Sequence, residues 1–241
     1  NMEGKEMRFG LIASILFTDI TTSFTTGSVN NMHDSLTPIG GMMPLWNMML
    51  NCIFGGKGVG FMNIIMYMMF GVFLCGLMVG RTPEFFGKKL EAKEMQIITF
   101  LILIHPIIIL VPSALSLIND LGTSGITNSG FHGISQVLYE YTSSAANNGS
   151  GFEGLGDGTT FWNIMTGIVM LLGRYISMIL MVIVGYSLYK KQPVPVNAST
   201  FKTDNLTFSF ILFFRILIIG ALTFLPALAL GPIAEHLSIW G

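Results

Sequence analysis

Charged residues are scarce in this sequence of 241 residues. It holds 12 lysines and arginines and 13 aspartates and glutamates, and charged residues make up 10% of the chain, where soluble domains carry about 25%. So few charges could not cover the surface of a soluble globule of this size, which excludes a freely soluble enzyme. The formal net charge of −1 also offers no positive field for nucleic acid.

Motifs of metal, cofactor and nucleotide chemistry are missing as well. The two cysteines, Cys52 and Cys75, lie far apart and form no CxxC pair, and the four histidines form no HExxH motif. The glycine-rich stretch 53–60 is no phosphate-binding loop, because Gly58 and not Ser or Thr follows Lys57. No DKTGT-like phosphorylation motif occurs. We therefore predict no catalytic site, organic cofactor, transition-metal site or ATP site in this chain.

What the chain has in abundance is hydrophobic residues, which make up 51% of it. One membrane-spanning helix needs about 20 apolar residues in a row. Four runs satisfy this requirement, and only the last two contain a charge, Arg174 and Arg215 respectively. The sequence therefore predicts an all-α polytopic membrane protein. The predicted spans are Phe61–Gly80, Ile97–Ile118, Phe161–Tyr189 and Leu206–Leu230.

The basic residues between the spans predict the orientation. Connector 81–96 holds Arg81, Lys88, Lys89 and Lys93, and connector 190–205 holds three lysines, whereas 119–160 and 231–241 hold no lysine or arginine. Since Lys and Arg gather in cytoplasmic loops, we expect both basic connectors inside and the C-terminus outside. The N-terminal segment then falls outside, although it contains Lys5 and Arg8. With no initiator Met before Asn1, we expect a piece of a longer protein.

An internal repeat is the most informative feature of the sequence. When Gly27-Ser28 is aligned with Gly149-Ser150, apolar, hydroxyl and Trp-Asn positions coincide. Each copy then consists of a short semi-polar helix, a Gly-Ser turn, an outer loop and a long apolar helix with one cation. The aligned segments are 15–17 with 137–139, 21–22 with 143–144, and 46–47 with 162–163.

The short helix of each copy, Leu11–Phe24 or Ile134–Ala146, is too short and too polar to cross a bilayer. We expect each to enter the membrane and return on the same side, which is the plan of a cation-channel pore loop. A glycine after a helix is also a common C-cap, but its occurrence in two matching copies favours an ion-coordinating loop. The predicted ion-binding residues, most of them acting through main-chain carbonyls, are Thr25, Thr26, Gly27, Ser28, Asn147, Asn148, Gly149 and Ser150.

Five motifs in order resemble one family. The runs GSVNNMHDSLTPIGG, NCIFGGKGVG, MVGRTPEFFGKK, TSSAANNGSGFEGLGD and GALTFLPALALGPIAEHL are similar to those of the potassium-binding A subunit of the Kdp potassium-transporting ATPase. The resemblance covers Asn1 to about Leu237. It implies a potassium-channel-like fold of four helix–pore loop–helix repeats plus a terminal helix at each end. The implied divisions are 1–96 for the third repeat, 97–205 for the fourth, and 206–241 for the last transmembrane helix and an extracytoplasmic tail.

The same resemblance implies a role in ATP-driven potassium uptake across the bacterial inner membrane. This subunit would bind and dehydrate K⁺, and a P-type ATPase B subunit would hydrolyse ATP, together with a single-span C subunit and a small F peptide. Gly27 and Gly149 match the filter glycines of the third and fourth repeats. Because two filter loops and the first helix of repeat three are absent, one copy cannot form a complete filter. The residues alone leave a stand-alone potassium channel or secondary transporter as the alternative.

Cations inside the apolar runs are candidate control points. The resemblance places a break of the second helix, a candidate gate, in 53–60, where Gly55, Gly56 and Gly58 surround Lys57. Lys57 is interpreted as a charge that obstructs the pore, or as a lysine that snorkels near a helix end. Arg174 requires a partner or an aqueous cavity, because an unpaired arginine at the bilayer centre costs about 2.5–3.5 kcal/mol. Arg174 controls the pore or pairs structurally, and for Arg215 packing or a helix contact is favoured.

Acidic residues near the predicted outer mouth have two interpretations. Asp34, Glu140, Glu153 and Asp157 could form a vestibule that concentrates cations, or they could be ordinary solvated or capping carboxylates.

Overall fold

The chain is a bundle of helices. The computed structural model describes residues 6–52, 54–56, 58–195, 203 and 205–241. Among these residues, four helices are long and apolar enough to cross a membrane: α4 (Val59–Val79), α5 (Ala92–Ile118), α8 (Thr160–Tyr189), and α9 (Leu206–Leu228) with its continuation to Trp240. They coincide with the four predicted spans to within a few residues, except that the last helix runs further. The prediction of an all-α polytopic membrane protein is confirmed.

The other elements are short. The two predicted semi-polar helices are present as α2 (Leu11–Ser23) and α7 (Phe131–Ala146). A third helix, α3 (Pro38–Leu50), follows the first of them and precedes α4. The remaining elements are α1 (Glu6–Phe9), the 3-10 turn η1 (His33–Ser35), strands β1 (Glu84–Phe85) and β2 (Lys88–Lys89), α6 (Asp120–Thr123), the π-helical turn η2 (Ala229–Ile233) and α10 (Ala234–Trp240).

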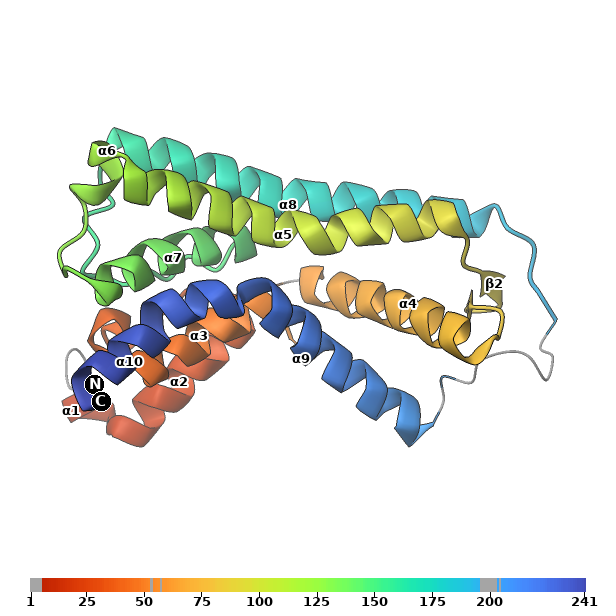
Figure 1. The fold of residues 1–241 in the computed structure, drawn as a ribbon, viewed down its shortest axis with the longest axis horizontal. Coiled ribbons are helices and arrows are strands. Elements are labelled where there is room, and N and C mark those ends of the chain that lie inside the picture. The colour runs from red at the N-terminus through yellow and green to blue at the C-terminus, as the bar shows by residue number, and fades with distance from the viewer. Residues whose placement is uncertain (1–5, 53, 57, 196–202, 204) are drawn as a thin grey trace.

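The long helices α5 and α8 lie side by side along the molecule, and α7 packs beneath them (Figure 1). Helix α7 begins at the end of the bundle where α5 stops and α8 starts, so the chain enters and leaves the α7 segment at one end, as expected of a re-entrant element. Helices α3 and α10 lie beside α7 at that end, with α2 packed against α3, and α4 and α9 occupy the other half of the bundle (Figure 1).

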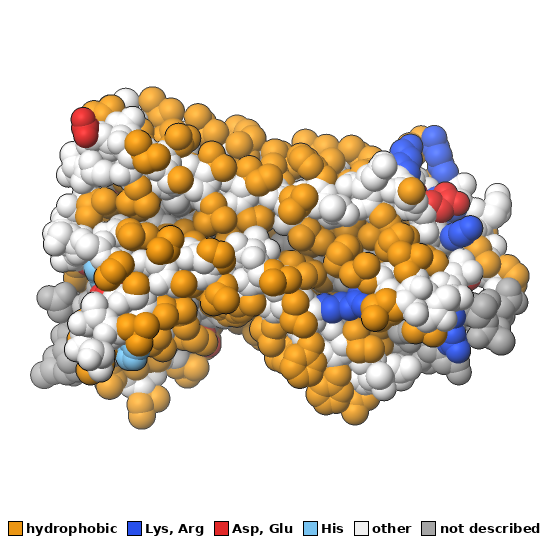
Figure 2. Space-filling model, viewed as in Figure 1, with side chains coloured by type: hydrophobic (Ala, Val, Ile, Leu, Met, Phe, Trp, Pro, Cys, Tyr) orange, Lys and Arg blue, Asp and Glu red, His pale blue; other side chains and the backbone are white. Residues whose placement is uncertain are grey.

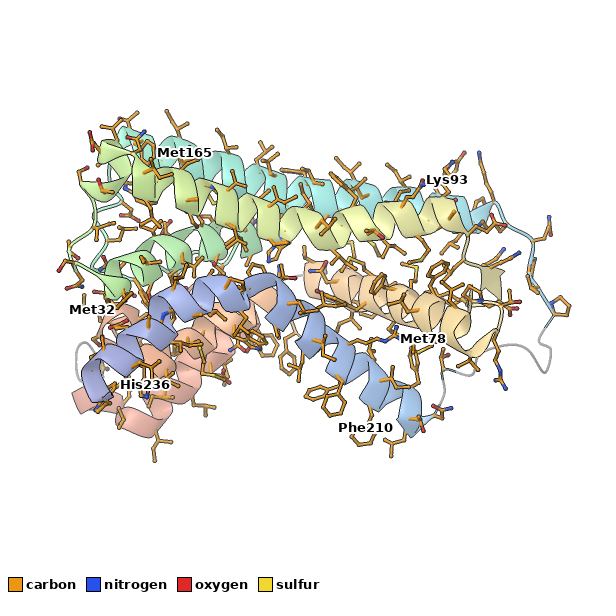
Figure 3. The ribbon with its side chains drawn as sticks, in the orientation of Figure 1. Met32, Met78, Lys93, Met165, Phe210 and His236 are labelled. Atoms are coloured by element: carbon orange, nitrogen blue, oxygen red, sulfur yellow. The ribbon has the colours of Figure 1, made fainter. Side chains whose placement is uncertain are left out.

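Apolar side chains cover the outside of the spans (Figure 2). Val182 on α8 is 69% exposed and Leu222 on α9 is 79% exposed. Met78 on α4 and Phe210 on α9 are also exposed (Figure 3). Exposed apolar surface of this extent is stable only against lipid or another protein. The low charge content and the outward faces of the helices therefore have the same explanation.

Lysine and arginine side chains gather at one end of the bundle (Figure 2). We call this end, with Arg81, Lys88, Lys89, Lys190 and Lys191, the basic end, although Glu91 and Glu94 also lie there. The opposite end, with Asp34, Asp120, Glu153, Asp157 and Glu235, is the acidic end. The two predicted basic connectors meet at the basic end. Lys191 from the second forms ion pairs of 3.0 Å with Glu91 and 2.7 Å with Glu94 at the start of α5.

Helix α9 bends before it reaches the acidic end. Pro226 and Pro232 remove two backbone donors, and the ladder is rearranged into the single π-helical turn η2. Gly231 in this turn lies close to α7, because a Cβ built on it would be 2.8 Å from the Ser135 hydroxyl. The segment 231–241, predicted as a tail, is mostly helical. It continues past α7 to the acidic end (Figure 1).

Close packing of α8 on the end of α7 sets the depth of the re-entrant helix. A Cβ built on Gly173 would lie 2.3 Å from the carbonyl oxygen of Ala145, closer than any real contact. Ala145 is in the last turn of α7. Glycine at position 173 is therefore required for α8 to support the C-terminus of α7.

We predict that Gly173→Ala lowers the stability of the full-length subunit by about 1–3 kcal/mol, because α8 must move away from a backbone oxygen. Gly167→Ala in the same helix is the matched control, since a Cβ there meets nothing within 4 Å. It should be neutral or slightly stabilising. The thermal midpoint in detergent measures both effects, and equal midpoints for the two variants would contradict the packing assignment.

Candidate functional site

The two predicted ion-binding loops have the same backbone geometry. The amide of Thr26 donates to the carbonyl of Thr21 at 3.0 Å, and in the second copy the amide of Asn148 donates to the carbonyl of Ser143 at 2.9 Å. These pairs occupy equivalent positions in the aligned repeats. The predicted repeat is therefore present in three dimensions, down to individual hydrogen bonds.

Positive φ angles also recur at equivalent positions. Thr25 and Asn147 have φ of 50° and 55°, and Gly27 and Gly149 have φ of 75° and 98°. Residues other than glycine rarely adopt this conformation, and those that do gather at functional sites. In each loop, residues with positive φ alternate with residues with negative φ, so the backbone is neither helical nor extended. Its carbonyl groups are therefore not all used in regular backbone hydrogen bonds.

Hydroxyl side chains in the last helical turns hold the loops. Thr21 donates to the carbonyl of Ser28 at 2.7 Å. In the second copy the Ser143 hydroxyl accepts from the amide of Gly149 at 3.1 Å. The aligned hydroxyl positions in the sequence thus have a structural reason, because each ties its own loop to the end of its own helix.

The two loops touch each other. A Cβ built on Gly27 would lie 2.1 Å from the carbonyl oxygen of Asn148, so any side chain at position 27 would displace the other loop. The Asn148 amide group donates to the Thr21 carbonyl at 3.0 Å. Gly149, in contrast, faces open space, since a Cβ there would meet nothing within 4 Å. The structure therefore brings the two predicted sets of residues together at one place.

The candidate gate lies directly against the first loop. Helix α3 ends at Leu50 and is capped by Asn51, which has φ of 39°, and α4 begins at Val59, so the second helix of this repeat is broken. The amide of Gly55 donates to the carbonyl of Ser23 at 2.8 Å, and a Cβ on Gly56 would be 2.5 Å from the Thr25 hydroxyl. Gly58 has φ of 79° and caps α4. Lys57 lies outside the described residues.

Beside this break lies an internal cavity. Polar side chains from α3 to α9 contribute to its lining, among them Asn51, Asn63, His105, Ser177 and Thr223. Asn63 donates to the Asn51 carbonyl at 2.7 Å and so fixes the end of α3. The Asn51 side-chain oxygen is buried, and within the described part of the chain it has no hydrogen-bond partner. These five polar groups therefore lie among apolar residues at one small cavity in the middle of the bundle.

The two arginines of the spans differ in their contacts. Arg215 donates to the carbonyl of Gly71 on α4 at 2.8 Å, so it makes the helix contact favoured from the sequence. Arg174 follows Gly173 and is half-buried below the end of α7. In the ranges that the structure describes, no hydrogen bond or ion pair of its guanidinium is present.

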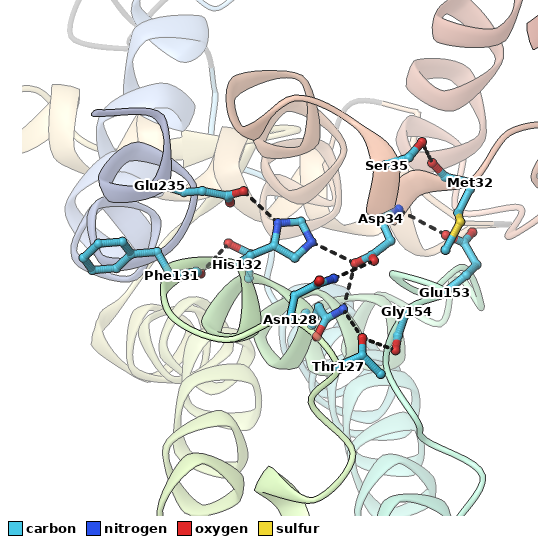
Figure 4. A network of polar contacts seen from close by, with 12 residues as sticks. Met32, Asp34, Ser35, Thr127, Asn128, Phe131, His132, Glu153, Gly154 and Glu235 are labelled. Atoms are coloured by element: carbon cyan, nitrogen blue, oxygen red, sulfur yellow. Dashed lines mark hydrogen bonds and ion pairs between the residues drawn. The ribbon is translucent and has the colours of Figure 1, made fainter. Parts of the chain in front are cut away.

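A polar network joins three segments at the acidic end (Figure 4). His132, at the start of α7, contacts Asp34 of η1 at 2.9 Å through Nε2 and Glu235 of α10 at 2.8 Å through Nδ1. Gln136 and Asn128 also donate to Asp34, at 3.0 and 3.2 Å. Of the acidic residues considered from the sequence, Asp34 is thus part of a buried hydrogen-bond network.

The network favours the protonated form of His132 and the ionised form of Asp34. The hydrogen bond to Asp34 raises the pKa of His132; burial acts against this rise, and Glu235 adds to it. Burial alone would raise the pKa of Asp34, but hydrogen bonds from His132, Gln136 and Asn128 outweigh it and lower that pKa. Burial raises the pKa of Glu153, which accepts from the Asp34 amide at 3.2 Å.

Comparison with known proteins identifies the family. The family described as "Potassium-transporting ATPase A subunit" matches residues 1–237. The chain belongs to this family. A potassium-transporting ATPase potassium-binding subunit from Geobacillus kaustophilus (strain HTA426) is 67% identical over 239 residues, and one from Clostridium acetobutylicum is 62% identical over the same length. Each alignment covers 99% of this chain and 43% of the relative, so the chain spans less than half the length of these A subunits.

The sequence predicted both loops but not the buried hydrogen bond of His33 with Tyr139, whose hydroxyl also contacts Ser150 of the second loop. His33 and Tyr139 are fully buried and hydrogen-bonded to each other at 2.8 Å, across 106 residues of sequence. The one available signal was that Tyr139 aligns with Phe17, so that only the second copy has a hydroxyl there.

We predict that the contribution of His132 to stability depends on pH. Its raised pKa means that the charged contact is complete below pH 6.5 and is lost as the pH rises through the pKa of the folded state. The lowered pKa of Asp34 means that its contribution is lost only below pH 3.8. His132→Gln, which keeps neutral hydrogen bonds, should therefore destabilise the subunit by about 2 kcal/mol near pH 5.5 and much less at pH 9.

Thermal midpoints across this pH range measure the effect. His236→Gln is the control, because His236 lies in α10 and packs against the Trp240 ring without contacting Asp34. A difference between wild type and His132→Gln that does not change with pH would contradict the charged form of the network.

Proposed function

We propose that this chain forms part of the ion-binding filter of a potassium uptake complex. The observation that carries the proposal is the pair of loops with matching positive φ angles that meet backbone to backbone, in a chain of the potassium-transporting ATPase A subunit family. The ion ligands are main-chain carbonyls of Thr25, Thr26, Gly27 and Ser28, and of Asn147, Asn148, Gly149 and Ser150. The remainder of the filter comes from the part of the longer relatives that this chain does not match.

Two features suit these loops to a dehydrated cation. Carbonyl oxygens replace the water shell of K⁺ when they are held at fixed spacing. Both α2 and α7 end immediately before a loop, so the negative ends of two helix dipoles point toward the same region. The side chains of Thr26 and Asn148 are occupied by hydrogen bonds, so the backbone oxygens are the available ligands at these two positions. K⁺ is the transported ion, and no organic cofactor takes part in its binding.

Control of the ion is assigned to the region next to the loops. The break that the sequence assigns to Gly55, Gly56, Lys57 and Gly58 acts as a gate, because the Gly55 amide donates to the Ser23 carbonyl at the end of α2 and Gly56 lies against Thr25 of the first loop. Arg174 places a positive charge below the end of α7 and opposes ions that move backward. The cavity beside Asn51 places the polar groups of Asn51, Asn63 and Thr223 next to this break.

Energy comes from a partner. We propose that a P-type ATPase B subunit hydrolyses ATP and receives K⁺ from this subunit, with the C subunit and the F peptide completing the complex. The basic end faces the cytoplasm by the positive-inside rule, so the acidic end and the C-terminus lie outside the bacterial inner membrane. K⁺ then enters from the acidic end, where the carboxylates lie.

We predict that Gly27→Asp or Gly149→Asp in the full-length subunit raises the KM for K⁺ of ion-stimulated ATP hydrolysis by about tenfold or more, equivalent to about 1.4 kcal/mol. Each variant strains a left-handed position in the filter, and Gly27→Asp also displaces Asn148. Gly130→Asp is the control, because Gly130 has φ of 79° but caps the far end of α7.

An unchanged KM in both filter variants would disprove the assignment of the loops. Potassium flux in liposomes that contain the full-length subunit without ATP or partners would instead favour the stand-alone channel or secondary transporter.

A further inference from the structure

Behind the second loop lies a chain of buried hydrogen bonds that begins and ends in the third repeat. His33 Nδ1 is 2.8 Å from the Tyr139 hydroxyl, which is 3.0 Å from the Ser150 hydroxyl. Ser150 Oγ donates to Asn148 Oδ1 at 2.5 Å, and Asn148 Nδ2 donates to the Thr21 carbonyl at 3.0 Å. The four side chains are between 0% and 7% exposed, so water does not compete for these bonds.

The direction of every bond in the chain follows from two backbone groups. The Ser150 amide can only donate, and it lies 2.9 Å from Asn148 Oδ1, which must therefore be an oxygen. The Thr21 carbonyl can only accept, so the other side-chain atom of Asn148 must be the nitrogen. The orientation of the Asn148 amide is thereby determined by its surroundings.

The remaining donors are then determined one by one. The single proton of the Ser150 hydroxyl is used toward Asn148, so the Tyr139 hydroxyl must donate to Ser150. Tyr139 in turn must accept from His33 Nδ1. His33 is therefore an imidazole protonated at Nδ1, and burial lowers its pKa to about 4, which keeps it neutral. All the side-chain bonds point from His33 toward Thr21, an arrangement in which each bond strengthens the next.

We propose that this chain of His33, Tyr139, Ser150 and Asn148 positions the second ion-binding loop against the first and thereby sets ion selectivity. It holds the loop at two points, Asn148 and Ser150, and anchors it to the third repeat at both ends. A carbonyl filter distinguishes ions only if its oxygens keep a fixed spacing, so the support behind it is part of the selectivity. These are positioning residues, because their side chains act through the backbone. The proposal rests on the proposed function of the loops.

The support is not symmetric. In the first copy Phe17 occupies the position of Tyr139 and cannot form such a chain. Stacking on Phe152, with ring centroids 4.3 Å apart, fixes the Tyr139 ring independently of its hydroxyl. Removing the hydroxyl alone therefore tests the chain while the packing remains.

The experiment compares Tyr139→Phe with Tyr141→Phe in the full-length subunit assembled with its ATPase. Tyr141 lies on the same helix, is equally buried, and bonds the Ser116 hydroxyl at 2.6 Å, away from the loops. The KM values for K⁺ and for the slightly larger Rb⁺, the kcat and the thermal midpoint are measured for both variants.

For Tyr139→Phe we expect a KM for K⁺ raised about tenfold, a reduced ratio of the Rb⁺ to the K⁺ KM, and little change in kcat. Tyr141→Phe should lower the thermal midpoint by a similar amount without changing the ratio of KM values. Ser150→Ala should reproduce the effect of Tyr139→Phe, and Ser150→Thr, which keeps a hydroxyl, should restore the ratio.

Equal KM ratios in Tyr139→Phe, Ser150→Ala and the wild type would overturn the proposal and leave the chain a structural feature only. If Tyr139→Phe does not assemble, the Ser150 pair decides by the same criterion. Failure of the proposed function is seen separately, because Gly27→Asp and Gly149→Asp would then leave the KM for K⁺ unchanged.

Discussion

The contact between Gly27 and the carbonyl oxygen of Asn148 is the constraint on which the rest of this structure depends. It requires two re-entrant helices from different repeats to end at the same depth with their loops in register. Because no side chain fits between Gly27 and Asn148, the two helices have to be held in place by contacts on their other sides. Gly173 of α8 supports the end of α7, and the broken helix beside Gly55 supports the end of α2.

Membrane surroundings explain why so many hydroxyl and amide groups gather around this contact. Irregular backbone deep in an apolar bundle leaves donors and acceptors that water cannot satisfy, and each unpaired group costs free energy. Thr21, Ser143 and Asn148 provide the missing partners from short side chains. Most charged groups lie near the ends, where Lys191 pairs with two glutamates and His132 joins Asp34 to Glu235, while Arg215 within a span donates to the Gly71 carbonyl.

The two copies of the repeat have diverged in how they are supported. The first loop is held mainly within its own segment, by Thr21, Thr26 and the broken helix. The second is held across the repeats, through Asn148, Tyr139 and His33.

The local sequence determined the four spans, the two short semi-polar helices and their turns, but not the helical course of 231–241. Charge-free runs of about 20 residues require helices in lipid, since no other single segment satisfies its own backbone, and the aligned Gly-Ser pairs identified both turns. The contacts of Asn148 with Thr21, of His33 with Tyr139, and of Arg215 with Gly71 were decided only by the tertiary structure. They join residues 106 to 144 positions apart, and a hydrogen bond depends on the final distance and direction between two atoms, which hydropathy and repeat patterns do not encode.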